Sequence, residues 1–268
     1  MKNKTIGIPR SLFYYKYRYL LTSFFKELKV NILISPQTDE DIFKKGKNIV
    51  NNKLCIPLQI FIGHVNYLKD KSDYILIIRM KEDCICYNSL YDLINNLFNI
   101  NILDLYISDE TTEEDSFIKI GLELGFSKQY VLNAYKQAKK YEYKQRKINY
   151  LLEHKKIEKD SKKVLIVSED YIYNDQYIKN DFMKLNKYKN IDFFYSNTIN
   201  PDIKPYKKAI LYNANSVKKI VNKTIYISTY PCVYKKTTFF DKSLTLEDIN
   251  LEKTIYECIN NGENNNDW

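Results

Sequence analysis

Short apolar runs alternate with amphipathic stretches along the first 110 residues of the chain. The apolar runs, which predict strands, are residues 6–9, 30–35, 74–78 and 101–107. The amphipathic stretches, which predict helices, are residues 11–28, 39–51 and 58–68. Continuous apolar runs are typical of strands that are buried on both faces of a parallel sheet. The alternation therefore predicts a doubly wound α/β lobe.

Two of the expected helices carry a start signal. Ser11 is expected to cap the first of them. Thr38 is expected to cap the second, whose first turn reads Asp39-Glu40-Asp41. A hydroxyl at the cap and carboxylates in the first turn both stabilise the positive end of a helix.

The pattern changes after residue 110. Residues 113–158 are helical in spacing and dense in charge, with a break at Gly125-Phe126-Ser127, which predicts a solvated connecting helix. Further apolar runs predict strands at 164–168, 192–195, 209–212 and 224–228, and helices at 176–186 and 245–260. The fold class is therefore α/β, with two Rossmann-like doubly wound parallel-sheet lobes joined by a helical segment. The expected divisions are an N-terminal lobe at 1–110, a bridge at 111–160, a smaller lobe at 161–260 and a frayed tail at 261–268.

The composition is basic but not in a pattern typical of nucleic-acid binding. The 268 residues carry 42 Lys and Arg against 33 Asp and Glu, a net charge of +9. The excess is mostly Lys, in a chain also rich in Asn, Ile and Tyr, and these four residues share AT-rich codons. No aromatic-interleaved basic motif accompanies the charge. We therefore expect no nucleic-acid partner, and a salt-sensitive nucleic-acid binder is the third-ranked hypothesis.

Several common classes of protein lack their motif here. With only six glycines, the chain has no Gly-rich loop of the kind that binds phosphates, and it has no G-x-S-x-G elbow. This argues against the usual ATPases, NAD enzymes and serine hydrolases. No apolar stretch approaches the length of a membrane span, and residues 1–5 lead directly into the first apolar run without a secretion signal. The expected location is cytoplasmic, away from any membrane.

Cysteine supplies the main candidate chemistry. Cys55 stands at a loop-to-helix junction, Cys84 and Cys86 follow the third apolar run, and Cys232 follows a strand expected in the second lobe. Open α/β sheets bind ligands at the carboxyl ends of their strands. Two interpretations of these cysteines remain open: they form a shared metal site, or they are small buried hydrophobic residues. The sequence does not decide between the two, because no C-x-x-C pair is present. Cys258 lies within the last expected helix and is most simply a core or surface residue.

Several short motifs follow one another in a specific order. They are Gly7-Ile8-Pro9-Arg10 with Tyr14-Tyr15 behind it, Cys55-Ile56-Pro57, Gly63-His64, Cys84-Ile85-Cys86, Tyr171-Ile172-Tyr173-Asn174-Asp175 and Pro231-Cys232. In this order they resemble the acyl-CoA dehydratase activase-related proteins, which are relatives of the 2-hydroxyacyl-CoA dehydratase subunits. The resemblance covers most of the chain and is strongest over residues 6–90.

The resemblance implies a cofactor and a chemistry. In that family, cysteines after the strands are taken to hold a [4Fe–4S] cluster between two Rossmann-like lobes. Carried over by position, the ligands would be Cys55, Cys86 and Cys232, with Cys84 as the alternative to Cys86. Three thiolates leave one iron open for a substrate oxygen or water. Arg10 and His64 are the candidates for contacts to substrate or cluster, and for any catalytic role.

In the dehydratases the resemblance further implies one-electron reduction of an acyl-CoA thioester. The electron comes from a separate ATP-dependent activator protein, as in the metabolism of an anaerobic bacterium. The sequence has no phosphate-binding loop, which is consistent with ATP being hydrolysed by the separate activator protein.

The chain also departs from the family pattern. Tyr87 follows Cys86 where the family has a proline, and Val233 follows Cys232 where the family has a glycine, which lets backbone approach a cluster closely. Two hypotheses therefore stand beside each other. One is an enzyme or enzyme component of reductive acyl-CoA chemistry or electron transfer; the other is a non-catalytic cluster-binding or partner-binding protein that has lost dehydratase activity.

Overall fold

The chain folds into two compact units. The computed structural model describes residues 4–80, 84–154, 162–178, 191–195, 222–228 and 242–245, together with positions 253, 255 and 257. Unit 1 comprises Met1–Gln145 and the short segment Asp175–Tyr177, and unit 2 comprises Arg146–Asn174 and Ile178–Trp268.

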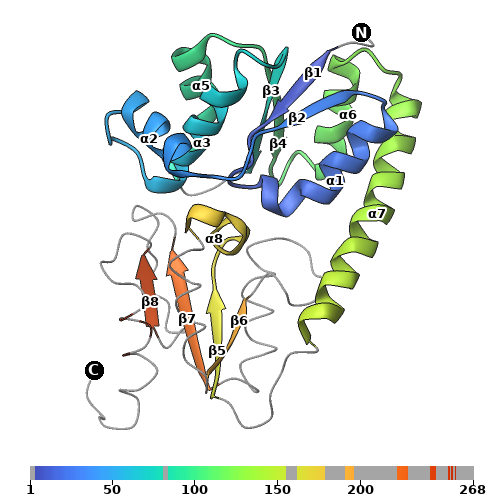
Figure 1. Cartoon of the computed structure of the whole chain (residues 1–268). Helices are drawn as coiled ribbons and strands as arrows, with labels where there is room; N and C mark the ends of the chain where they lie inside the picture. Colours follow the sequence, from blue (N-terminus) through green and yellow to red (C-terminus); the bar gives the residue numbers. More distant parts are fainter. Residues whose placement is uncertain are drawn as a thin grey trace. The chain divides into compact units, whose positions relative to one another are not determined.

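Unit 1 is built on a parallel sheet of four strands in the order β2-β1-β3-β4 (Figure 1). The strands are β1 (Thr5–Ile8), β2 (Asn31–Ile34), β3 (Tyr74–Met80) and β4 (Ile102–Ile107). Their apolar side chains form the core, and those of Ile6, Ile8 and Ile77 are fully buried. All four strands were predicted from the apolar runs, and the α/β class is confirmed.

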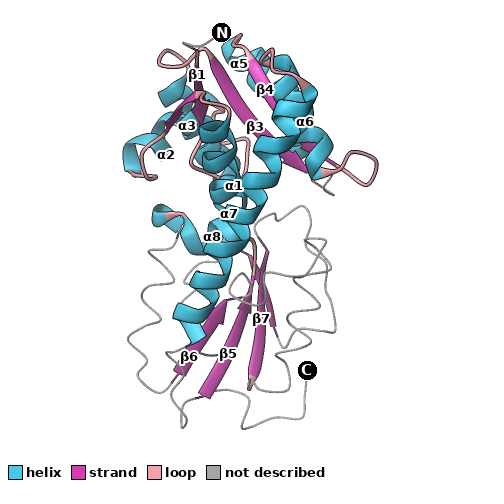
Figure 2. Ribbon diagram, turned by 90° about the vertical axis from the view of Figure 1, so that its right-hand side faces the viewer, coloured by secondary structure: helices cyan, strands magenta, loops and turns pink. Residues whose placement is uncertain are grey.

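Helices cover both faces of this sheet (Figures 1 and 2). One face carries α1 (Tyr14–Glu27), α6 (Glu113–Glu123) and the first part of α7 (Lys128–His154). The other face carries α2 (Glu40–Ile49), α3 (Ile56–Leu68) and α5 (Leu90–Phe98). The predicted break between α6 and α7 is confirmed: Gly125 has a φ of 84°, in the left-handed region that favours glycine.

Two expected helix caps are wrong. The helix after β1 begins at Tyr14, and Ser11 is buried ahead of it. The cap of α2 is Asp39, whose carboxylate accepts the Ile42 N–H at 2.8 Å. Thr38 and Asp39 both have a suitable side chain, and the backbone of Asp39 takes the extended conformation of a cap. The Thr38 hydroxyl is thereby left for a tertiary contact.

Unit 2 repeats the strand order of unit 1. Its parallel sheet has the order β6-β5-β7-β8, as Figure 2 shows for three of its strands. The strands are β5 (Lys162–Val167), β6 (Ile191–Tyr195), β7 (Lys223–Ser228) and β8 (Lys242–Thr245), and α8 (Asp170–Asn174) follows β5. The predicted strand at 209–212, the tail at 261–268 and most of the two last predicted helices lie outside the described residues. Strand β8 was not predicted.

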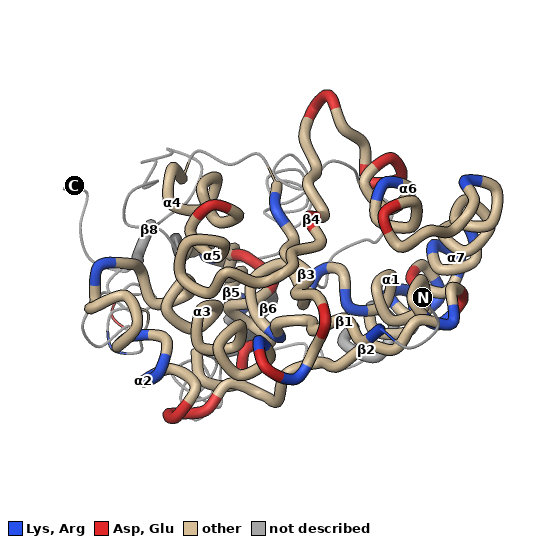
Figure 3. The backbone as a smooth tube through the Cα atoms, turned by 90° about the horizontal axis from the view of Figure 1, so that it is seen from above, with Lys and Arg blue, Asp and Glu red and all other residues tan. Residues whose placement is uncertain are grey.

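Charged residues of both signs are interspersed along the described elements (Figure 3). On α2, for example, Lys44 and Lys45 pair with Glu40 and Asp41 one turn earlier. Exposed pairs of this kind contribute little to stability. Among the described residues, no helix has the length and apolar character needed to cross a bilayer.

Candidate functional site

A buried polar cluster lies where β1 and β2 end in unit 1. Pro9 follows β1, and the next residue, Arg10, donates its backbone N–H to the hydroxyl of Ser35 at 2.8 Å. Ser35 follows β2 and is fully buried. The carboxyl ends of these strands are where a sheet of this topology binds ligands. The two loops are therefore tied together at the edge of the sheet where these strands end.

His64 lies on α3 and is fully buried in this cluster. Its Nε2 lies 3.0 Å from the hydroxyl oxygen of Thr38, in the loop after β2. The Thr38 hydroxyl donates to Asp175 Oδ2 at 2.6 Å. Asp175 belongs to the segment of unit 1 that is contributed by residues 175–177. Three residues that are far apart in the sequence thus form one hydrogen-bonded line.

Asp175 is surrounded by donors. Besides Thr38, the hydroxyl of Tyr15 donates to Oδ2 at 3.2 Å, and the backbone N–H of Tyr177 donates to Oδ1 at 3.0 Å. Hydrogen bonds from several donors favour the ionised form of a buried carboxyl group. Burial, and then the charge of Asp175, raise the pKa of Tyr15 above its ordinary value. Tyr15 therefore stays protonated and acts as a donor.

Two nitrogens of the cluster have no hydrogen-bond partner among the described residues. They are Nδ1 of His64 and Nε of Arg10, and both atoms are buried. A buried polar atom without a partner costs about 1–3 kcal/mol. Such groups are rare in folded proteins, and each calls for an explanation.

Burial keeps His64 neutral. Desolvation, and after it the positive charge of Arg10, lower the pKa of His64 to about 3, although the carboxylate of Asp39 acts in the opposite direction. The imidazole is therefore uncharged at neutral pH, and its ring nitrogens differ in protonation.

This depressed pKa predicts a loss of stability in mild acid. Below about pH 6.5 the unfolded chain binds a proton at position 64, whereas the folded chain does not until the pH approaches 3. The free energy of unfolding should therefore fall by roughly 1 kcal/mol for each pH unit between about pH 6 and 4. Denaturant titrations across this range should show a smaller slope in His64→Gln. Equal slopes in the two proteins would contradict the assignment.

The described cysteines of unit 1 differ in exposure. Cys55 is the N-cap residue of α3 and is partly exposed. Cys84 is the N-cap residue of a short helix, α4 (Ile85–Asn88), and is buried. Cys86 lies within α4 and is exposed. Their predicted positions, at a helix start and after β3, are thus observed, whereas Cys232 and Cys258 lie outside the described residues.

The turn that carries Cys84 and Cys86 is anchored to β3, which the sequence did not predict. The buried Tyr87 donates its hydroxyl to the carbonyl of Ile78 at 2.7 Å. Arg79 donates to the carbonyl of Asn88, at the end of α4, at 2.9 Å. Arg79 is itself held by Asp104 of β4 through two hydrogen bonds, of 2.9 and 2.6 Å. The two contacts fix α4 relative to the end of β3.

The thiol donors suit an iron–sulfur cluster, but the described residues do not complete a site. No three His, Cys, Asp or Glu side chains lie close enough to hold a metal ion within that part of the chain. The third predicted ligand, Cys232, lies outside it. The two thiols of intermediate or high exposure, Cys55 and Cys86, have the chemistry that iron–sulfur clusters require.

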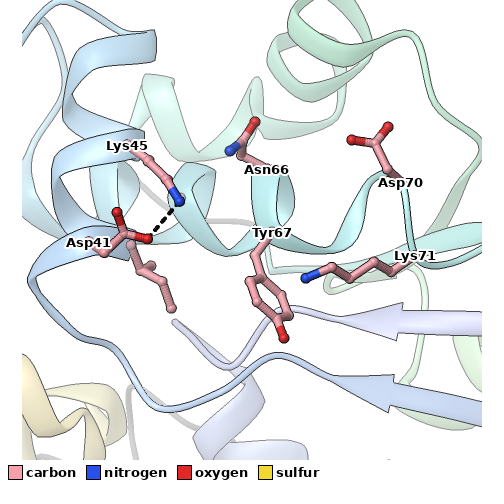
Figure 4. Close-up of a pocket in the computed structure, with 8 residues that line it drawn as sticks. Asp41, Lys45, Asn66, Tyr67, Asp70 and Lys71 are labelled. Carbon is pink, nitrogen blue, oxygen red and sulfur yellow. Dashed lines mark hydrogen bonds and ion pairs between the residues drawn. The ribbon is translucent and has the colours of Figure 1, made fainter.

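A separate pocket of about 190 Å³ lies between α2 and α3 (Figure 4). Its polar lining includes Asp41 and Lys45, which pair with each other, and Lys71, whose ammonium lies 3.3 Å from the centre of the Tyr67 ring. None of the predicted site residues lines it. These charges already have partners, so the pocket gives no indication of a ligand.

Comparison with known proteins identifies one family. The family described as CoA enzyme activase uncharacterised domain (DUF2229) matches residues 5–199, which is more than half of the chain. The matched region contains Arg10, Cys55, His64, Cys86 and Asp175. A search of curated proteins found no match.

Proposed function

We propose, from the premise that this chain belongs to the CoA enzyme activase-related family DUF2229, that it is an iron–sulfur protein of reductive acyl-CoA chemistry or electron transfer. The family match over residues 5–199 is the observation that carries the proposal. The ligands would be Cys55, Cys86 and Cys232, with Cys84 as the alternative to Cys86. A [4Fe–4S] cluster bound there would supply electrons one at a time.

The chemistry of the described thiols supports this ligand set. Cys55 is partly exposed and stands at the start of the 13-residue helix α3, where the helix dipole favours a thiolate. Cys86 is exposed on a turn that two hydrogen bonds hold against β3. Cys84 is buried, and burial in apolar surroundings disfavours the thiolate. Cys86 is therefore the preferred ligand of the pair.

The proposed partners are an ATP-dependent activator protein and an acyl-CoA substrate. The chain has no phosphate-binding loop of its own, so ATP hydrolysis would belong to the activator. The second candidate function is a non-catalytic cluster-binding or partner-binding protein. The departures after Cys86 and Cys232 favour it, because they change the immediate surroundings of two ligands.

Iron analysis of anaerobically purified protein tests the proposal. We expect about four iron and four sulfide ions per chain and a visible charge-transfer absorption. Cys55→Ser, Cys86→Ser and Cys232→Ser should each reduce the iron content severalfold, whereas Cys258→Ser is the matched control and should retain it. Cys84→Ser decides between the two neighbouring thiols.

A reconstituted wild-type protein without iron would overturn the cluster. Iron bound as well by Cys55→Ser, Cys86→Ser and Cys232→Ser as by the wild-type protein would overturn the ligand set instead. With the cluster in place, turnover of acyl-CoA in the presence of an activator favours the enzyme, and binding of the activator without turnover favours the second candidate.

A further inference from the structure

The hydrogen-bonded line from Asp175 to His64 determines which ring nitrogen carries the proton. The Thr38 hydroxyl has a single hydrogen, and it is donated to Asp175 at 2.6 Å. The hydroxyl oxygen can then only accept from His64, whose Nε2 lies 3.0 Å away. A neutral histidine with its proton on Nε2 has a bare lone pair on Nδ1. The hydrogen-bonded line from Asp175 through Thr38 to His64, which we call the relay, therefore fixes His64 as a hydrogen-bond acceptor at Nδ1.

The bare Nδ1 and the unpartnered Nε of Arg10 are complementary. The arginine Nε–H is always a donor, and the histidine Nδ1 in this tautomer is an acceptor. Both atoms are buried and lack a partner in the part of the chain that the structure describes. Arg10 lies close enough to His64 for its charge to lower the pKa of that residue, and Arg10 as a whole is partly exposed whereas His64 is buried. A ligand group bound between the two atoms would find one acceptor and one donor.

These two atoms distinguish a neutral group from an anion. A carboxylate accepts from Arg10 but has no hydrogen to donate to Nδ1, and its charge faces a lone pair there. A carboxamide or a hydroxyl satisfies both atoms, because each donates one hydrogen bond and accepts another. The relay prevents the imidazole from switching to the other tautomer, since Thr38 cannot also donate to it.

We propose that His64 and Arg10 form a binding site for a neutral ligand group that both donates and accepts a hydrogen bond, such as a carboxamide or a hydroxyl. Thr38 and Asp175 are positioning residues, which hold His64 in the Nε2–H tautomer. The site uses residues of unit 1 and requires no metal. It is therefore independent of the proposed cluster and is testable on the apo protein.

Nitrogen-15 NMR of the histidine ring in the full-length apo protein tests the tautomer. We expect a pyridine-like Nδ1 and a pyrrole-like Nε2 for His64 at neutral pH. Thr38→Val should allow a mixture of tautomers, whereas Thr38→Ser keeps the hydroxyl and should preserve the wild-type spectrum. A protonated Nδ1 in the wild-type protein, or an unchanged tautomer in Thr38→Val, would overturn the relay.

Acetamide and acetate, which have nearly the same shape, test the ligand class. Acetamide should shift the Nδ1 resonance of His64 in a saturable manner, and acetate should not. Arg10→Met and Thr38→Val should each weaken the acetamide response at least severalfold, and Lys45→Met serves as a control that should leave it unchanged. Binding of acetate in place of acetamide, or no response to either probe, would show that no site of this class exists.

Discussion

Gly46→Ala is expected to lower the free energy of unfolding by about 3 kcal/mol, because α2 and α3 touch at their backbones. A methyl group at Gly46 would overlap the carbonyl oxygen of Gln59 and lie 2.7 Å from the backbone nitrogen of Gly63. Gly63 faces the carbonyl of Ile42 in the same way. Backbone atoms cannot rotate aside as a side chain can, so the two helices would have to separate. Denaturant unfolding of the full chain, followed by circular dichroism, measures the change.

The sign of the change in the free energy of unfolding shows whether helix packing or helix propensity dominates at Gly46. Alanine stabilises an open helix by about 1 kcal/mol relative to glycine, so propensity alone would make Gly46→Ala stabilising. Asn48→Ala, at an exposed position of the same helix, is the control and should change stability by less than about 0.5 kcal/mol. A Gly46→Ala protein as stable as the wild type would show that α2 and α3 are not in backbone contact. His64 would then lack the rigid support of this helix pair.

The strands of unit 1 were predictable because each is a short apolar run that ends at a clear break. The two helices after β3 were not predicted. Helix α5 spans nine residues and buries only Leu90 and Ile94, and its N-cap residue, Ser89, makes no side-chain cap. Two buried positions one turn apart are a weak periodic signal. Helix α4 has four residues, and tertiary contacts through Arg79 and Tyr87 hold it in place.

The polar cluster around His64 could be predicted from the sequence only in part. Arg10 and His64 were candidates from the sequence motifs, and the structure places both in one cluster. The sequence predicts Thr38 as a helix cap, because threonine and aspartate are both favoured at that position. Its actual partner, Asp175, lies 137 residues away along the chain. Sequence periodicity and cap preferences relate only residues that are close along the chain. The contact between Thr38 and Asp175 therefore becomes visible only in the tertiary fold.

Arg79→Met should destabilise the protein by about 3 kcal/mol and loosen the turn that carries Cys84 and Cys86. The side chains of Arg79 and Asp104 are only 17% and 15% exposed, so the substitution leaves a largely buried carboxylate without its partner. It also removes the hydrogen bond to Asn88 at the end of α4. Hydrogen bonding to Asp104 raises the pKa of Arg79, which is consistent with a strongly coupled pair. Denaturant unfolding measures the global effect.

Thiol alkylation of the apo protein measures the local effect. In the wild-type protein the exposed Cys86 should react quickly and the buried Cys84 slowly. Arg79→Met should accelerate alkylation of Cys84 about tenfold, because the turn opens more readily, while Cys86 changes little. The control is Lys45→Met, which breaks an exposed ion pair and should cost less than about 0.5 kcal/mol without altering either rate. If Cys84 stayed protected in Arg79→Met, the contact with Tyr87 alone would be holding α4 on β3, and Arg79 would have no part in positioning the thiols.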